Sequence, residues 1–179
     1  MTISPFEVRA ATDADAEAVR GLVFPVMEEF GLGVVPDGAD SDLYEIEASY
    51  TDRGGWLELL TRDGSLVGTV GMYPVGDDSI ELRKMYLRAD MRGAGLGKAL
   101  LARSIERAQQ AGFREIVLET ATVLKTAIAL YERFGFSRDV DDYPGCGKTA
   151  CDQVWRLQLA GYELPNTNMP ELQDEEGEP

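Results

Sequence analysis

Hydrophobic positions recur along the chain with two different periods. The clearest helical segment places Leu101, Ile105 and Ala108 at i, i+4 and i+7, the spacing of one helix face. Asp63-Gly64 lies between two strand-like segments and is typical of a tight hairpin turn. The same reasoning predicts helices over residues 13–30, 42–50, 96–111 and 125–134, and strands over residues 6–9, 56–62, 66–73, 79–87, 116–119, 154–159 and from 136 onward.

The order of these elements indicates the class of fold. Hairpin-linked strands come first, and strands then alternate with helices, which predicts a mixed α/β fold with a central sheet flanked by helices. A chain of 179 residues suits one domain, which we place at residues 1–160. From Gly161 onward Pro and Glu dominate, and no Lys or Arg follows Arg156. Residues 161–179 are therefore predicted to be an acidic, flexible tail.

The net charge of the chain excludes some classes of binding partner and favours others. Lys and Arg number 17 against 32 Asp and Glu, a net charge of −15. Phosphate backbones and anionic membrane surfaces repel such a chain, so we expect neither nucleic acid nor membrane as a partner. A cationic amine would be attracted, although the charge also serves solubility. No signal peptide and no apolar run near the ~20 residues of a membrane span are present, so we expect a cytoplasmic protein.

The chain contains no histidine. This excludes Ser-His-Asp and Cys-His nucleophile systems and any site in which histidine ligates a metal. A general base must then be a carboxylate, Tyr, Lys, Cys or a relayed water. Cys146 and Cys151 alone make a poor metal site, so no metal is expected.

A glycine-rich loop, residues 92–98, follows a predicted strand and opens a predicted helix. Backbone amides at a helix start lack partners and the dipole is positive there, so such a loop suits a phosphate group. A Rossmann fingerprint from Gly93 would need glycine where Lys98 stands, and a P-loop would need Ser or Thr where Ala99 stands. Two interpretations remain: a phosphate-binding loop of another kind, and a purely structural turn.

Three segments together resemble a known family. Arg92-x-x-Gly95-x-Gly97 resembles the acyl-CoA signature of the GNAT superfamily of N-acetyltransferases. Residues 82–87 resemble that family's central strand, and residues 127–136 resemble its second signature, a helix followed by a strand. The two signatures in this order are far more specific than either alone, while the tail has no counterpart.

The resemblance implies acetyl-CoA as cosubstrate and a mostly antiparallel sheet in which one parallel strand pair splays apart to admit the pantetheine arm. Main-chain groups on the central strand would pair with the pantetheine amides. The glycine loop would hold the pyrophosphate. Leu124 departs from the family, which often has at that position an Asn that bonds the cofactor. The implied cofactor-binding residues are Met85, Tyr86, Leu87, Arg92, Gly93, Ala94, Gly95, Leu96, Gly97 and Lys98.

Two residues are candidates for catalysis. Glu81 is the candidate base: in a regular strand it would share a face with Met85 and Leu87, and the family often places a carboxylate on this strand. A surface carboxylate paired with Arg83 is the alternative. Tyr131 matches the family's acid for the departing thiolate, and a core tyrosine is the alternative.

The resemblance predicts an N-acetyltransferase that moves the acetyl group of acetyl-CoA directly to a primary amine of a small molecule. A protein N-terminal or lysine acetyltransferase is the second hypothesis, and a non-catalytic acyl-CoA-binding sensor is the third. A homodimer is compatible with the sequence, which does not identify the acceptor. Further residues considered for the acceptor site are Asp42, Glu45 and Glu47 for a cationic acceptor, Arg83 and Lys84 for an anionic one, and Tyr143 and Cys146 in a late loop.

Overall fold

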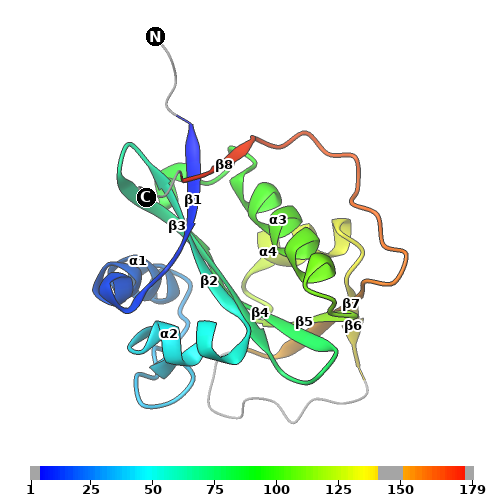
Figure 1. Cartoon of the computed structure of the whole chain (residues 1–179), viewed down its shortest axis with the longest axis horizontal. Coiled ribbons are helices and arrows are strands. Elements are labelled where there is room, and N and C mark those ends of the chain that lie inside the picture. The colour runs from blue at the N-terminus through cyan, green and yellow to red at the C-terminus, as the bar shows by residue number, and fades with distance from the viewer. Residues whose placement is uncertain (1–4, 141–150, 176–179) are drawn as a thin grey trace.

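The computed structural model describes residues 5–140 and 151–175. They form one mixed eight-stranded sheet in the order β6-β7-β5-β4-β3-β2-β1-β8 (Figure 1). Neighbouring strands run antiparallel except for the pairs β4–β5 and β1–β8. The strands are β1 (Phe6–Ala10), β2 (Trp56–Arg62), β3 (Ser65–Pro74), β4 (Ser79–Leu87), β5 (Glu115–Thr120), β6 (Ser137–Asp139), β7 (Gln153–Gln158) and β8 (Leu172–Asp174).

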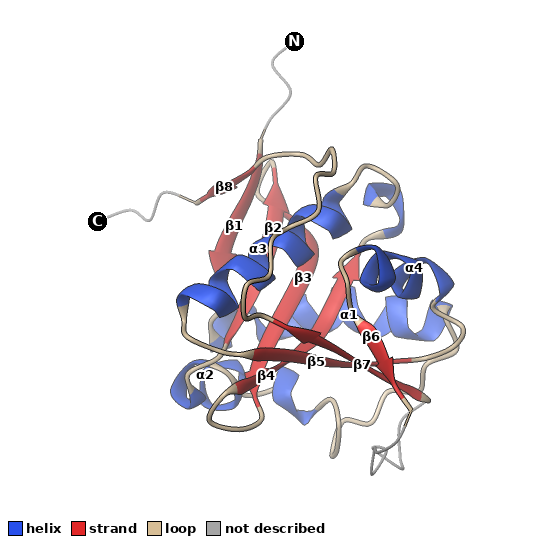
Figure 2. Ribbon diagram, turned by 90° about the vertical axis from the view of Figure 1, so that its right-hand side faces the viewer, coloured by secondary structure: helices blue, strands red, loops and turns tan. Residues whose placement is uncertain are grey.

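Helices cover both faces of the sheet, which confirms the predicted fold class (Figures 1 and 2). The helices are α1 (Ala16–Glu29), α2 (Ile46–Ser49), α3 (Leu96–Gln110) and α4 (Lys125–Arg133). One apolar cluster, with Ile80, Leu100 and Leu118, lies between the sheet and α3 and α4. A second, with Val23 and Leu57, lies between the sheet and α1 and α2. Among the described residues no helix combines the length and apolar character needed to cross a bilayer.

Local sequence explains several boundaries. Asp63 and Gly64 both have positive φ, 51° and 70°, which is the tight hairpin turn predicted between β2 and β3. Pro25 lies inside α1, which continues from Ala16 to Glu29, so the proline does not split the helix. Burial of its apolar face against the sheet offsets the lost backbone hydrogen bond.

Residues 161–175 differ from the flexible tail that the composition suggests. They run across the α3 side of the domain and end as β8, which pairs with β1 in the register Phe6 to Leu172 (Figure 1). The Tyr162 hydroxyl donates to the Phe134 carbonyl at 2.7 Å, and Arg103 Nη2 donates to Asp174 at 2.5 Å. Leucine and methionine side chains of this segment pack on the α3 cluster, which supplies the apolar burial that composition alone does not reveal.

Candidate active site

The parallel pair β4–β5 separates part-way along its length. Its ladder begins at Ser79 opposite Glu115 and ends at Leu82 opposite Leu118, although both strands continue. From there to Leu87, β4 keeps its pairing with β3 alone. The side of β4 that faces β5 therefore presents backbone groups without a strand partner, which an extended amide-bearing arm can pair with. The splayed pair that the resemblance implied is confirmed.

A β-bulge shapes β4 at the same place. Gly71 of β3 lies opposite Arg83, but Thr69 lies opposite Tyr86, so β4 carries one extra residue between them. Lys84 lies within this bulge with φ of 50°, a left-handed conformation that is uncommon outside glycine. The Thr69 hydroxyl donates to the Lys84 carbonyl at 2.7 Å and holds the bulge.

The bulge corrects the expected position of Glu81. Because one extra residue inverts the alternation, Met85 and Leu87 pack on the α3 side of the sheet together with Leu82, whereas Tyr86 packs on the α1 side. Glu81, adjacent to Leu82 in the strand, projects to the α1 side as Tyr86 does. The prediction that Glu81 shares a face with Met85 and Leu87 is therefore wrong.

The glycine loop lies directly beyond the splayed end of β4. Gly93 and Gly95 have φ of 81° and 84°, and α3 begins at Leu96. A Cβ atom on Gly97 would lie 3.6 Å from Leu130 of α4, an ordinary contact distance, so the first turn of α3 lies beside α4. Leu96 is buried in the core, so only its main chain is available to a ligand. Ala94 is exposed and Lys98 is half-buried.

Arg92 has partners within the protein. Its Nη1 and Nη2 donate to the two carboxylate oxygens of Glu29 at 2.6 and 2.8 Å, and its Nε donates to the Leu87 carbonyl at 3.0 Å. The guanidinium also lies over the Phe30 ring, 5.2 Å from its centroid. The side chain thus joins the glycine loop to the end of α1, and the structure does not direct it toward a cofactor.

Tyr131 lies on α4 with 6% of its surface exposed, and its ring packs on Phe136 with centroids 5.7 Å apart. Burial raises the pKa of the Tyr131 hydroxyl well above its usual range, and the nearby Cys151 thiol raises it further. Burial also raises the pKa of the Tyr86 hydroxyl, and the charges of Cys151 and Tyr131 raise it further. Both hydroxyls therefore stay protonated near neutral pH.

Glu81 is 7% exposed and accepts a hydrogen bond from Arg83 Nη2 at 2.5 Å. Burial raises the pKa of the Glu81 carboxyl above its usual value, Arg83 opposes this, and the carboxylates of Glu119 and Asp42 raise it further. Arg83 in turn lies over the Tyr73 ring at 4.2 Å. The alternative pairing of Glu81 with Arg83 is thus observed, but at a buried position beside the splay rather than on the surface.

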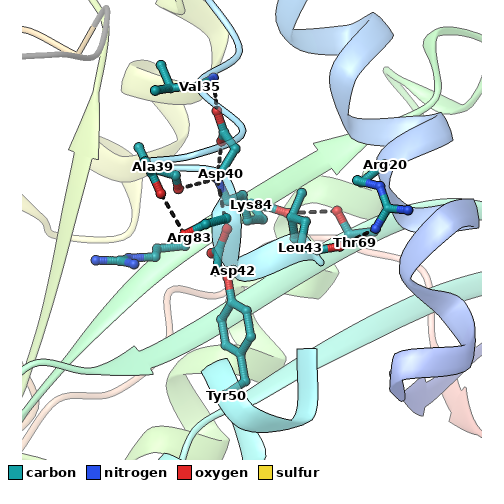
Figure 3. Close-up of polar contacts among 12 residues, drawn as sticks. Arg20, Val35, Ala39, Asp40, Asp42, Leu43, Tyr50, Thr69, Arg83 and Lys84 are labelled. Carbon is teal, nitrogen blue, oxygen red and sulfur yellow. Dashed lines mark hydrogen bonds and ion pairs between the residues drawn. The ribbon is translucent and has the colours of Figure 1, made fainter. Parts of the chain in front are cut away.

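A buried polar cluster joins Lys84 of β4 to Asp40, Asp42 and Tyr50 (Figure 3). The Lys84 ammonium forms ion pairs with Asp40 and, at 3.5 Å, with Asp42. Asp42 also accepts a hydrogen bond from the Tyr50 hydroxyl at 2.5 Å. Asp40 and Tyr50 were not predicted, since the cluster forms around Lys84, which pairs with Asp40, 44 residues away, and leaves no local signal.

Two of the three acidic residues considered for a cationic acceptor already have partners within the protein. Asp42 belongs to the buried cluster, and Glu47 accepts a hydrogen bond from the Asp13 amide at 3.0 Å. Glu45 is exposed. Tyr143 and Cys146 lie outside the described residues. Leu124 caps the start of α4 and packs against the α1-side cluster, so it offers no polar contact.

Residues 24–136 match the sequence model of the Acetyltransferase (GNAT) family. The chain belongs to this family. One relative is the uncharacterized N-acetyltransferase YjgM of Escherichia coli (strain K12), 36% identical over 152 residues, which cover 81% of this chain and 90% of the relative. Another is N-acetylaspartate synthetase of Danio rerio, 34% identical over 133 residues, which cover 69% of this chain and 46% of the relative.

Solved structures show the same GNAT fold. The structure of yncA from Salmonella typhimurium with its cofactor acetyl-CoA aligns with a TM-score of 0.66 and 19% identity, over 93% of this chain and 98% of that one. The GNAT chain described here is an acetyl-CoA-dependent acyltransferase. Across residues 5–140 and 151–175, no group of three or more His, Cys, Asp or Glu side chains is arranged to hold a metal ion.

Proposed function

We propose that this enzyme transfers the acetyl group of acetyl-CoA directly to a primary amine of a small molecule, within a ternary complex. The observation that carries the proposal is the end of the β4–β5 ladder at Leu82, which leaves β4 open toward β5 up to Leu87, ahead of the glycine loop that opens α3. Acetyl-CoA supplies the activated acetyl thioester. The name of the relative N-acetylaspartate synthetase supports a small acceptor.

The chain's own groups fit the shape of the cosubstrate. The main chain of Met85 to Leu87 has no strand partner on the side toward β5 and suits the amides of a pantetheine arm there, apart from the Leu87 carbonyl, which accepts from Arg92. Amides from Gly93 to Lys98 suit the pyrophosphate, because they start a helix of fifteen residues and glycines let the phosphate approach closely. In this assignment Arg92 is a positioning residue that holds the loop against α1.

Two groups on β4 and α4 suit the proton transfers. A lysine-like amine, with a pKa of ~10.4, is neutral in only about one molecule in a few thousand at pH 7, so a base increases the reactive fraction. We assign that role to the Glu81 carboxylate, which takes the proton that the amine loses. The Tyr131 hydroxyl donates a proton to the departing thiolate sulfur. A protein acetyltransferase would use the same groups, whereas an acyl-CoA sensor would need neither.

Acetyl-CoA should stabilise the protein in a thermal-shift experiment, while NADH and ATP at equal concentration should not. A ligand at 100 times its Kd adds about 2.7 kcal/mol of stability, which is readily measured. Release of CoA thiol in a screen of amines then separates the enzyme from a sensor. The absence of any shift at millimolar acetyl-CoA would mean that the glycine loop is only a turn.

Glu81→Gln should lower kcat/KM and remove its acid limb. The pKa of Glu81 is raised by burial, so its ionised form accumulates at higher pH than for an ordinary carboxylate, and the activity of the wild type should rise through that range. The pH–rate profile measures this directly. Glu106→Gln, at an exposed position on α3, is the matched control. An unchanged acid limb in Glu81→Gln would assign the base to a water relay or to Glu119.

A further inference from the structure

We propose that the acceptor carries a carboxylate beside its amine, as an amino acid does, and that Arg83 and Arg53 bind that carboxylate. This inference rests on the proposed function, because it identifies the substrate class of the same site. It is carried by two guanidinium groups that meet at one aromatic ring beside Glu81.

Arg83 retains donors for a ligand. Within the described residues, its Nη2 donates to Glu81, while its Nε and Nη1 have no hydrogen-bond acceptor. The side chain is 30% exposed, and its guanidinium carbon lies over the Tyr73 ring, 4.2 Å from the centroid. In Figure 3 it points away from the Lys84 cluster. By contrast Arg92 uses three of its donors on partners inside the protein.

Arg53 approaches the same ring. Its guanidinium carbon lies 5.7 Å from the centroid of Tyr73, and its Nε donates to the Ala48 carbonyl at 3.3 Å. Among the described residues it forms no ion pair. The planar guanidinium of arginine presents paired N–H donors that match the two oxygens of a carboxylate. Two such groups thus lie 4.2 and 5.7 Å from the centroid of the same Tyr73 ring.

The neighbouring charges leave these two cations available. Although the chain has a net charge of −15, Asp40 and Asp42 face the Lys84 ammonium, which offsets one of their two negative charges. Glu81 lies two residues from Arg83 on the same face of β4, and Glu119 projects to the same face of β5, near enough to raise the pKa of Glu81. Carboxylates beside guanidiniums complement the two charges of a zwitterionic amino acid. In the proposed orientation, the ammonium of the amino acid faces Glu81 and its carboxylate faces Arg83 and Arg53.

The test compares amino acids with their carboxamides as acceptors, including aspartate, glutamate and alanine against the matching amides. CoA thiol release is followed from pH 7 to 9.5, so that rates are compared per neutral amine. Wild type should prefer the acids. Arg53→Gln and Arg83→Lys should each raise KM for the acids by about ten-fold to a hundred-fold relative to KM for the matching amides, the effect of one charged hydrogen bond, and should leave KM for acetyl-CoA unchanged.

Arg62→Gln is the matched control, because Arg62 also lies over an aromatic ring, at 4.8 Å from Phe6, but at the far end of β2. It should leave every parameter unchanged. Equal use of acids and amides by the wild type would overturn the inference, as would a variant that raises KM for both alike. If acetyl-CoA stabilises the protein but no amino acid is acetylated, the amino-acid acceptor is overturned and the acetyl-CoA site is kept. If acetyl-CoA neither stabilises the protein nor releases thiol with any amine, the proposed function itself is overturned.

Discussion

Replacing Tyr131 by Phe should lower turnover ten-fold or more between pH 7 and pH 8. Burial and the Cys151 thiol raise the pKa of the Tyr131 hydroxyl, so it remains protonated across this range and ready to donate to the thiolate. Phe keeps the ring, and with it the packing on Phe136, so the change removes a proton donor and little else. A positioned general acid contributes about 10²- to 10⁴-fold to rate. Steady-state thiol release at saturating acetyl-CoA measures the effect.

The matched control is Tyr44→Phe, which removes the same hydroxyl from a side chain that is 46% exposed. Its turnover should equal that of wild type. The folded state of Tyr131→Phe is checked by thermal unfolding with and without acetyl-CoA, and both curves should match those of wild type. Turnover at the wild-type level across the pH profile would assign Tyr131 to the core alone.

Lys84→Met should lower the free energy of unfolding by about 3–5 kcal/mol, the usual cost of removing one partner from a buried ion pair. The Lys84 side chain is 9% exposed and is the cation that faces Asp40 and Asp42, which are 3% and 8% exposed. Methionine keeps most of the volume but leaves two buried carboxylates beside each other without a cation. Urea denaturation followed by circular dichroism measures the loss.

Two further variants separate burial from charge. Arg88→Met removes one partner of an exposed pair with Asp90, and it should leave the unfolding midpoint unchanged. Adding Asp40→Asn and Asp42→Asn to Lys84→Met should recover a large part of the loss, because no unpaired charge then stays buried. The ion-pair explanation fails if Lys84→Met is no more destabilising than Arg88→Met.

Much of the fold could be predicted because its signals are local. The strands at residues 56–62 and 79–87 have the bounds that alternation and turn residues predict, and Asp63-Gly64 forms the expected turn. The glycine loop also lies where a helix start suits a phosphate. Each of these depends on residues that are neighbours in sequence, so one sequence is sufficient to find them.

The position of Glu81 could not be predicted, because it depends on a bulge. Glycine or asparagine would have signalled the left-handed residue, but Lys84 occupies it, held by pairing with β3 and by Asp40 and Asp42 from a distant segment. The carboxylate that was expected to face the cofactor arm therefore lies with Tyr73, Arg83 and the α1 side. The same separation in sequence hid the Arg53–Arg83 arrangement, which exists only once the turn after α2 and strand β4 bring both residues to Tyr73.

The eight-stranded sheet ends at both edges in strands of three residues, β6 and β8. Without β8, the five residues of β1 would form one edge and offer their backbone to any neighbouring chain. Natural proteins keep edge strands short to prevent sheets from joining edge to edge and aggregating. Among the described residues, a second molecule that extended this sheet would find only three residues to pair with at either terminal strand, so the arrangement of the chain's last segment protects the enzyme from polymerising through its own sheet.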